Sequence, residues 1–148
     1  IAENNARFNA PLVIFEEDIF RSSLQDGSFD CVVSSFGLKT FSPEQQCVLA
    51  GIVRRILKPG GVFAFIELSL PMYLILRVPL IFYLRYVVPP IGRLFLGNPD
   101  NYRMLSIYTE GFRDAGHFQS CLINEGLEAN YISHFFGCGT GVVGRKVT

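Results

Sequence analysis

The sequence predicts an α/β fold with a mostly parallel sheet that ends in an antiparallel hairpin. The run from Phe29 to Phe36 is apolar with β-branched residues in its middle, which is typical of a strand covered on both faces in a parallel sheet. A helical pattern and a second apolar run, from Val62 to Leu68, follow directly. A strand, a helix and a strand at this spacing predict a right-handed crossover between parallel strands.

Both ends of the helix between these strands are marked in the sequence. Ser42 is placed to cap the helix, Pro43 suits its first position, and Gln45 completes a capping box. The motif Lys-Pro-Gly-Gly at 58–61 ends it. The apolar residues that recur at helical spacing are Leu49, Ile52, Val53 and Ile56. We therefore expect one apolar stripe of this helix to lie on the sheet.

Polar and small residues follow each of the two predicted strands. Those after the first strand are Ser34, Ser35, Gly37, Lys39 and Thr40, and those after the second are Glu67 and Ser69. Ligands of such folds bind beyond the carboxyl ends of the strands. We therefore expect any active site at this edge of the sheet.

An acidic turn follows another short apolar segment near the start of the chain. Pro11 to Phe15 is predicted to be a strand, poorly paired with the strand at Phe29–Phe36, and residues 16–18 read Glu-Glu-Asp. An acid at a strand end can accept hydrogen bonds from a ribose or an adenine amine. From spacing alone, a solvated turn is the alternative.

The end of the chain is predicted to close the sheet with two strands. Leu127–Phe136 and Thr140–Val147 flank the turn at 137–139, so we expect them to pair as an antiparallel hairpin. The glycine-rich run at 137–144 lacks the Lys-Ser/Thr pair and the following helix of a phosphate-binding loop. We therefore interpret these glycines as part of the hairpin.

Length, net charge and cysteine pattern limit the classes of protein to which the chain can belong. The 148 residues fit a single domain, and the net charge of zero gives no reason to expect a nucleic-acid partner. The four cysteines, with no metal-ligand spacing among them, are interpreted as reduced thiols of a cytoplasmic protein. No metal is expected, and His117 and His134 are interpreted as ordinary histidines.

The segment from Pro71 to Gly97 combines large apolar residues with arginine as its only charged residue type. Its arginines interrupt every long apolar run, and its prolines (Pro79, Pro89 and Pro90) are expected to break a helix, so it is not predicted to span a membrane. A helical insertion at about 71–110 is predicted instead. It is either a lid over an apolar pocket, an interfacial patch touching lipid phosphates, or a segment packed on the core.

Several motifs resemble a known family. SFD, SSFGLKTF, RRILKPGG and ELSLP together are similar to the second half of class I S-adenosylmethionine-dependent methyltransferases. Pro-x-Ile-Gly at 89–92, followed by Tyr-Arg-x-Leu at 102–105, resembles the ubiquinone/menaquinone biosynthesis C-methyltransferase family. The resemblance runs from about Ala10 to Gly144 and implies a Rossmann-like single domain. The glycine-rich first motif of the family would precede Ile1, so we expect the chain to be partial and inactive alone.

The resemblance implies site residues at positions that match. Asp18 matches the residue that binds the adenine amine, and Ile19 its neighbour, whose backbone N–H reaches the ring. Ser35, Phe36 and Gly37 match the strand end that lines the methionine side of S-adenosylmethionine. Lys39 and Tyr102 are candidate substrate contacts, although Lys39-Thr40 replaces the Arg-Asn pair usual in the family. No catalytic base is identified.

The resulting hypothesis is methyl transfer to a hydrophobic small molecule, with C-methylation of a quinone precursor as its specific form. The alternatives are methylation of another lipophilic substrate, an inactive remnant that binds a membrane surface, and a nucleotide-dependent oxidoreductase. If the protein methylates a hydrophobic small molecule, we expect it in the cytoplasm, with peripheral contact at the inner face of the membrane as a further expectation. The oligomeric state is left open.

Overall fold

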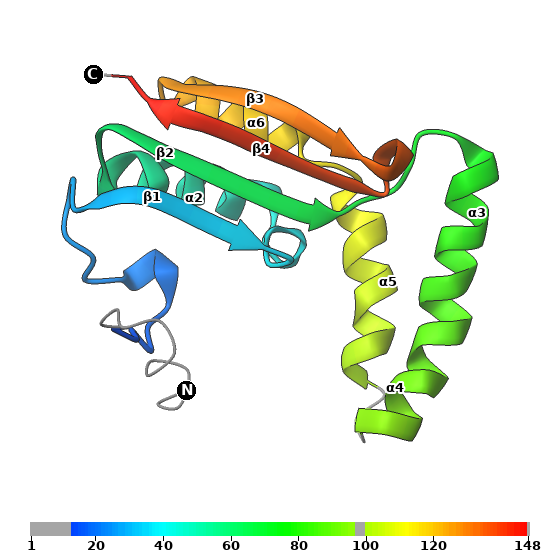
Figure 1. The fold of residues 1–148 in the computed structure, drawn as a ribbon. Helices are drawn as coiled ribbons and strands as arrows, with labels where there is room; N and C mark the ends of the chain where they lie inside the picture. The colour runs from blue at the N-terminus through cyan, green and yellow to red at the C-terminus, as the bar shows by residue number, and fades with distance from the viewer. Residues whose placement is uncertain (1–12, 97–99, 148) are drawn as a thin grey trace, which may run out of the picture.

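The computed structural model describes residues 13–96 and 100–147, without the side chains of residues 93–96 and 100–103. Four strands form one sheet in the order β1-β2-β4-β3 (Figure 1). These strands are β1 (Phe29–Ser35), β2 (Leu57–Leu68), β3 (Leu127–His134) and β4 (Gly139–Lys146). Strand β1 pairs with β2 in parallel, whereas β2–β4 and β3–β4 are antiparallel. The α/β fold and its antiparallel hairpin are confirmed, but "mostly parallel" overstates the parallel part of the described sheet.

Helix α2 (Pro43–Ile56) makes the predicted crossover between β1 and β2. The Ser42 side chain accepts the Gln45 backbone N–H, and the Gln45 side chain accepts the Ser42 backbone N–H, so the capping box is confirmed. Of the predicted stripe, Leu49, Val53 and Ile56 are buried. The helix ends at Ile56, before the Lys-Pro-Gly-Gly motif at 58–61 that was expected to end it. The motif lies within β2, which begins at Leu57.

The core lies between the sheet and two helices on one of its faces, α2 and α6 (Gly116–Asn124) (Figure 1). Phe118 of α6 is fully buried, and its ring meets that of Phe65 of β2 edge-on, with ring centroids 4.9 Å apart. Val142 of β4 is also fully buried in this cluster. The β1–β2 crossover and the β3–β4 hairpin therefore share one core.

The opposite face of β1 is open to solvent within the described residues. Val33 is 71% exposed, and Cys31 is exposed as well. The expectation that this strand is covered on both faces is therefore wrong for the structure described. The reason is that α2 and α6 both pack on the same side of the sheet.

The segment near the start of the chain is not a strand in its described part. Residues 13–15 have no regular secondary structure and are exposed, while residues 11–12 lie outside the described residues. As expected, the described residues of this segment are not paired with β1. The chain continues into the short helix η1 (Ile19–Arg21), which Asp18 caps by accepting the Phe20 backbone N–H at 3.0 Å.

Most of the described chain between β2 and α6 is helical. The helical part consists of α3 (Leu74–Phe82), the π-helix η3 (Tyr83–Val87), α4 (Val88–Leu96) and α5 (Asp100–Phe112), and it extends beyond the end of the sheet (Figure 1). The expectation that the prolines break this helix is wrong. Pro79 lies inside α3, and the helical path continues through Pro89 and Pro90.

A π-helical turn allows the helix to pass the two prolines. Residues 89 and 90 have no backbone N–H to donate to the carbonyl groups four residues earlier. Directly before the prolines, the Val88 N–H donates to the Tyr83 carbonyl, which lies five residues earlier and not four. Helical structure therefore continues through residues 89 and 90, although these two residues donate no α-type hydrogen bonds, and α4 runs in a different direction from α3 (Figure 1).

Candidate functional site

The carboxyl ends of β1 and β2 meet at a buried ion pair. Lys39 Nζ lies 2.7 Å from Glu67 Oε1, and the side chains of both residues are almost completely buried. The Glu67 carboxylate also accepts the backbone N–H groups of Lys39, at 3.1 Å, and Leu68, at 2.7 Å. Lys39 Nζ donates in addition to the Phe36 carbonyl at 2.9 Å. One carboxylate thus fixes the loop after β1 to the end of β2.

The loop between β1 and this ion pair contains three of the predicted cofactor residues. Ser35 ends β1, and Phe36 continues the pairing by donating its N–H to the Ile66 carbonyl at 3.0 Å. Phe36 has a φ of 59° and a 61% exposed side chain. A left-handed backbone at a bulky residue is uncommon and is often found at functional sites. The strand end therefore presents an aromatic ring to solvent in a fixed backbone conformation.

Ile19 and Gly37, two of the predicted cofactor residues, line the same cavity of about 290 Å³ beside β1. The rings of Phe20 and Phe41 meet edge-on at 5.2 Å and connect η1 to the segment after β1. Asp18 does not line this cavity, and its carboxylate is exposed at the start of η1. The structure thus brings the two predicted segments together, with Asp18 at their margin.

Of the two candidate substrate residues, Lys39 and Tyr102, only Lys39 has a described side chain. Lys39 lies at the expected edge of the sheet, but its ammonium group contacts Glu67 and the Phe36 carbonyl. Its Nζ is also 5.8 Å from the centroid of the Phe36 ring, within the range of a cation–π contact. Tyr102 lies in α5, and its side chain is outside the described part of the structure.

A second cavity, whose polar lining the sequence did not indicate, lies at the end of β2, next to the β3–β4 turn. It has a volume of about 490 Å³, and its polar lining includes Arg77, Arg113, Asp114 and Tyr131. Burial, together with the negative charge of Asp114, raises the pKa of the Tyr131 phenol, against a hydrogen bond to Thr140 that lowers it. These residues are far apart in the sequence, so no local motif reveals their convergence.

Backbone strain is concentrated around this cavity. Arg113 (φ 65°) and Phe136 (φ 58°) line it in left-handed conformations, and Phe135 (φ 50°) is adjacent. Both phenylalanine side chains are at least 80% exposed. Such conformations cost of the order of 1–3 kcal/mol each and are frequent at binding sites.

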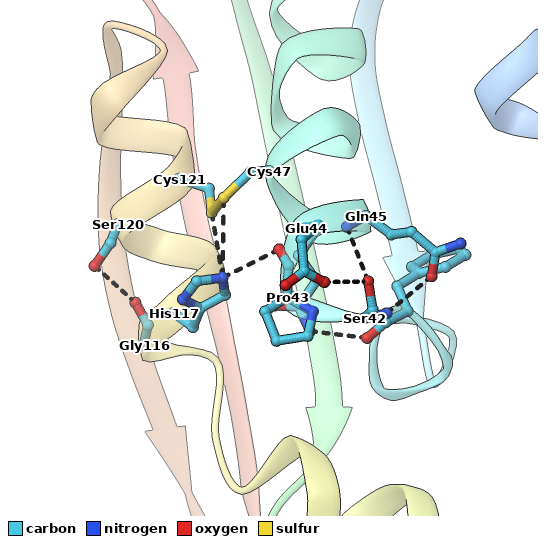
Figure 2. The surroundings of a disulfide bond; sticks show 11 residues. Ser42, Pro43, Glu44, Gln45, Cys47, Gly116, His117, Ser120 and Cys121 are labelled. Carbon is cyan, nitrogen blue, oxygen red and sulfur yellow. Dashed lines mark hydrogen bonds between the residues drawn. A yellow bond between two sulfur atoms is a disulfide. The ribbon is translucent and has the colours of Figure 1, made fainter.

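Cys47 of α2 and Cys121 of α6 form a disulfide beside His117 (Figure 2). The prediction that all four cysteines are reduced is therefore wrong for this pair, whereas Cys31 and Cys138 are free. The prediction failed because the two cysteines are 74 residues apart and meet only when α2 and α6 pack together. The helical spacing of His117 and Cys121 was the one local signal of a cluster.

The first turn of α2 lies next to this cluster (Figure 2). A hydrogen bond from the Ser42 hydroxyl, at 2.7 Å, is the main reason that the pKa of Glu44 is lowered. The Glu44 backbone N–H and the charge of His117 lower it further. His117 Nε2 lies 3.1 Å from the Pro43 carbonyl oxygen. His117 is thus in contact with both helices.

The fold defines a class of protein. Human N-acetylserotonin methyltransferase, solved in complex with S-adenosylmethionine, matches this chain with a TM-score of 0.55. The match covers 90% of this chain and 33% of that chain at 20% sequence identity. At this identity the likeness concerns the fold, which is that of class I methyltransferases.

Residues 16–146 match the ubiE/COQ5 methyltransferase family, and the chain belongs to this family. The demethylmenaquinone methyltransferase of Parafrankia sp. (strain EAN1pec) is 37% identical over 89 residues, which are 60% of this chain and 34% of that protein. The ubiquinone/menaquinone biosynthesis C-methyltransferase UbiE of Blochmanniella pennsylvanica (strain BPEN) is 24% identical over 127 residues, 85% of this chain and 49% of that protein. The resemblance inferred from the motifs is confirmed, and the chain spans a third to a half of these relatives.

Proposed function

We propose that this chain contributes the strand-end part of the active site of an S-adenosylmethionine-dependent methyltransferase that acts on a hydrophobic small molecule. The observation that carries the proposal is the family match over residues 16–146, which includes both strand ends and the loop between β1 and α2. The names of the relatives favour C-methylation of a quinone precursor over another lipophilic substrate. The same names favour an enzyme over a nucleotide-dependent oxidoreductase or a binding remnant.

The residues of the β1 edge fit the methyl donor. S-adenosylmethionine supplies a methyl group on a positively charged sulfur. Asp18 would accept hydrogen bonds from the adenine amine, and the apolar side chain of Ile19 lines the adjacent cavity. The exposed ring of Phe36 could attract the sulfonium through its π face. The described residues thus offer a hydrogen-bond acceptor, Asp18, and an exposed aromatic ring, Phe36, for the methyl donor.

Lys39 and Glu67 are proposed to position the site. Methyl transfer is an in-line displacement, so its rate depends on how accurately the two reactants are held. The Glu67 carboxylate holds the loop after β1 through the Lys39 ammonium and backbone N–H groups. Because the ammonium is already paired inside the protein, we assign Lys39 to holding the loop, and Tyr102 remains the proposed substrate contact.

Asp18→Ala is expected to weaken S-adenosylmethionine binding by about 1–3 kcal/mol, roughly 5- to 150-fold, because the adenine amine loses its acceptor. The chain spans only part of its relatives, so its own affinity is expected to be weak. Amide chemical shifts in an NMR titration report such binding. Glu16→Ala is the control, since it removes a neighbouring exposed carboxylate. Equal affinities for Asp18→Ala and the unmodified chain would remove Asp18 from the site.

We further propose that the α3–η3 segment is a lid that contacts a membrane surface in the cytoplasm. No residue of α3 is buried, and its exposed apolar side chains include Leu74, Ile75 and Val78. The stretch Leu74–Gly92 is long and apolar enough to cross a membrane by length and composition, and 11% of it is buried. The arginines favour an interfacial position, in which apolar side chains insert and basic groups meet lipid phosphates.

Replacing Arg77, Arg85 and Arg93 with Gln is expected to lower binding to anionic phospholipid vesicles by about 1 kcal/mol per residue at low salt. Vesicle co-sedimentation at two salt concentrations measures this, because salt screens the attraction. The control is Arg54→Gln with Arg145→Gln, which changes exposed arginines outside the helical segment. If the unmodified protein does not bind these vesicles, the membrane contact is excluded.

A further inference from the structure

Three potential metal ligands from two helices converge at the surface of the core. Cys47 comes from α2, while His117 and Cys121 are four residues apart on α6 and therefore share one face of that helix (Figure 2). His117 Nε2 lies 3.6 Å from Cys121 Sγ and 3.9 Å from Cys47 Sγ. The three donor atoms all lie within 4.8 Å of one another. A disulfide alone requires no histidine at this position.

These distances suit a tetrahedral metal site. With Zn–S bonds of about 2.3 Å and Zn–N bonds of about 2.0–2.1 Å, a tetrahedral ion places sulfur and nitrogen ligands about 3.5 Å apart. Both observed Nε2–Sγ distances are close to this value. The two sulfur atoms, bonded in the disulfide, would have to separate to about 3.8 Å. Rotation about the Cα–Cβ bonds of Cys47 and Cys121, whose Cα atoms lie 4.9 Å apart, would supply this separation.

The helices that carry the ligands are held firmly by the core. On α6, Cys121 is buried, and its neighbours Phe118 and Leu122 are fully buried. On α2, Ala50 is fully buried one turn from Cys47. The ligand positions are therefore set by packing on the sheet and do not depend on the disulfide. The backbone of the site should persist when the disulfide is reduced.

We propose that, after reduction of the Cys47–Cys121 disulfide, Cys47, His117 and Cys121 bind a divalent cation of the Zn²⁺ type. Two thiolates and an imidazole are a donor set that selects Zn²⁺ and related transition metals over Mg²⁺ or Ca²⁺. A thiol or phosphine reductant supplies the two electrons that break the S–S bond and give two thiol groups. The cation then displaces one proton from each thiol, so the complex of M²⁺ with two thiolates is neutral.

Binding through His117 Nε2 would replace its contact with the Pro43 carbonyl. This carbonyl belongs to the first residue of α2 and accepts the backbone N–H four residues later, so it keeps a partner. Three protein ligands leave a fourth position for a solvent molecule or small anion. His117 is exposed and also lines a cavity of about 440 Å³ that reaches Lys39 and Thr40. The site is therefore accessible from outside.

The consequence is that α2 and α6 stay cross-linked in either redox state. Under oxidising conditions the link is the disulfide. Under reducing conditions the metal takes its place, and the two links exclude each other because they use the same sulfur atoms. This inference rests only on the α2–α6 cluster and is independent of the proposed methyl transfer.

Co²⁺ titration of the 148-residue chain tests the proposal, because thiolate ligation gives Co²⁺ intense near-ultraviolet charge-transfer absorption and tetrahedral geometry gives strong visible bands. After anaerobic reduction with a phosphine, we expect one Co²⁺ per chain, displaced by Zn²⁺. The disulfide form should show neither band. Absence of the bands from the reduced chain, or equal bands in both forms, would overturn the proposal.

Variants identify the ligands. Cys47→Ser, Cys121→Ser and His117→Ala should each lower the affinity for Zn²⁺ at least about tenfold in competition with a chromophoric chelator. His117 is exposed, so its replacement should leave the fold intact even if Cys121→Ser does not. The matched controls are Cys31→Ser with Cys138→Ser, which removes the free thiols, and His134→Ala. Unchanged affinity for His117→Ala, or loss of binding in the controls, would contradict the assignment.

Discussion

Glu67→Ala is expected to destabilise the protein by about 3–5 kcal/mol, because it leaves the buried Lys39 ammonium without its counter-charge. The same change removes the acceptor of two backbone N–H groups, those of Lys39 and Leu68. Both side chains of the ion pair are almost completely buried, so water cannot easily replace the lost partner. Urea unfolding followed by circular dichroism measures the change in the free energy of unfolding.

An exposed ion pair of the same length provides the control. Lys58 Nζ lies 2.7 Å from Asp30 Oδ2, with side chains that are 44% and 83% exposed. Asp30→Ala should change the free energy of unfolding by no more than about 1 kcal/mol. If Asp30→Ala and Glu67→Ala lowered the free energy of unfolding by similar amounts, burial of the Lys39–Glu67 pair would not increase its effect on stability.

Gly141→Ala and Gly144→Ala are each expected to destabilise the protein by about 3 kcal/mol, at the upper end of the range for overpacking. A Cβ atom at Gly144 would overlap the Glu128 carbonyl oxygen and lie 2.6 Å from Phe63 Cζ. At Gly141 it would overlap the Phe65 carbonyl oxygen. These contacts involve the backbones of β2 and β3, which flank β4 in the sheet, so they cannot be relieved by rotating a side chain alone.

Gly111→Ala is the matched control for these glycines. Gly111 lies in α5, and nothing lies within 4 Å of the position that its Cβ would take. Alanine is favoured over glycine in a helix by up to about 1 kcal/mol, so this change should be neutral or stabilising. Thermal unfolding of the three variants gives the comparison. Wild-type stability of Gly144→Ala would show that β3 and β4 do not pair with Gly144 opposite Ala129.

Local signals explain which parts of the fold could be predicted from the sequence. The capping box at Ser42 and Gln45 involves residues three apart, and the helical stripe and apolar strands are equally local. The hairpin of β3 and β4 follows from two apolar runs and a short turn. The order of the sheet, with β4 between β2 and β3, depends on packing between distant segments and has no local signal.

The parts of the structure that could not be predicted depend on long-range contacts, or on a local change in backbone hydrogen bonding that accommodates prolines in a helix. Glu67 and Lys39 were both placed at strand ends, but their pairing joins residues 28 apart. The cluster of Cys47 with Cys121 requires two helices to meet. The prolines were expected to end the helix, since a π-turn that accommodates them has no sequence signature.

The ends of β1 and β2 are proposed to form part of a methyl-donor site. An NMR titration of the 148-residue chain with S-adenosylmethionine tests this proposal most directly, because each amide reports its own surroundings. We predict shifts that saturate at millimolar ligand and are concentrated at Asp18–Ile19 and Ser35–Gly37. Shifts confined to the cavity at Arg77 and Tyr131, or no shifts at these concentrations, would contradict the account.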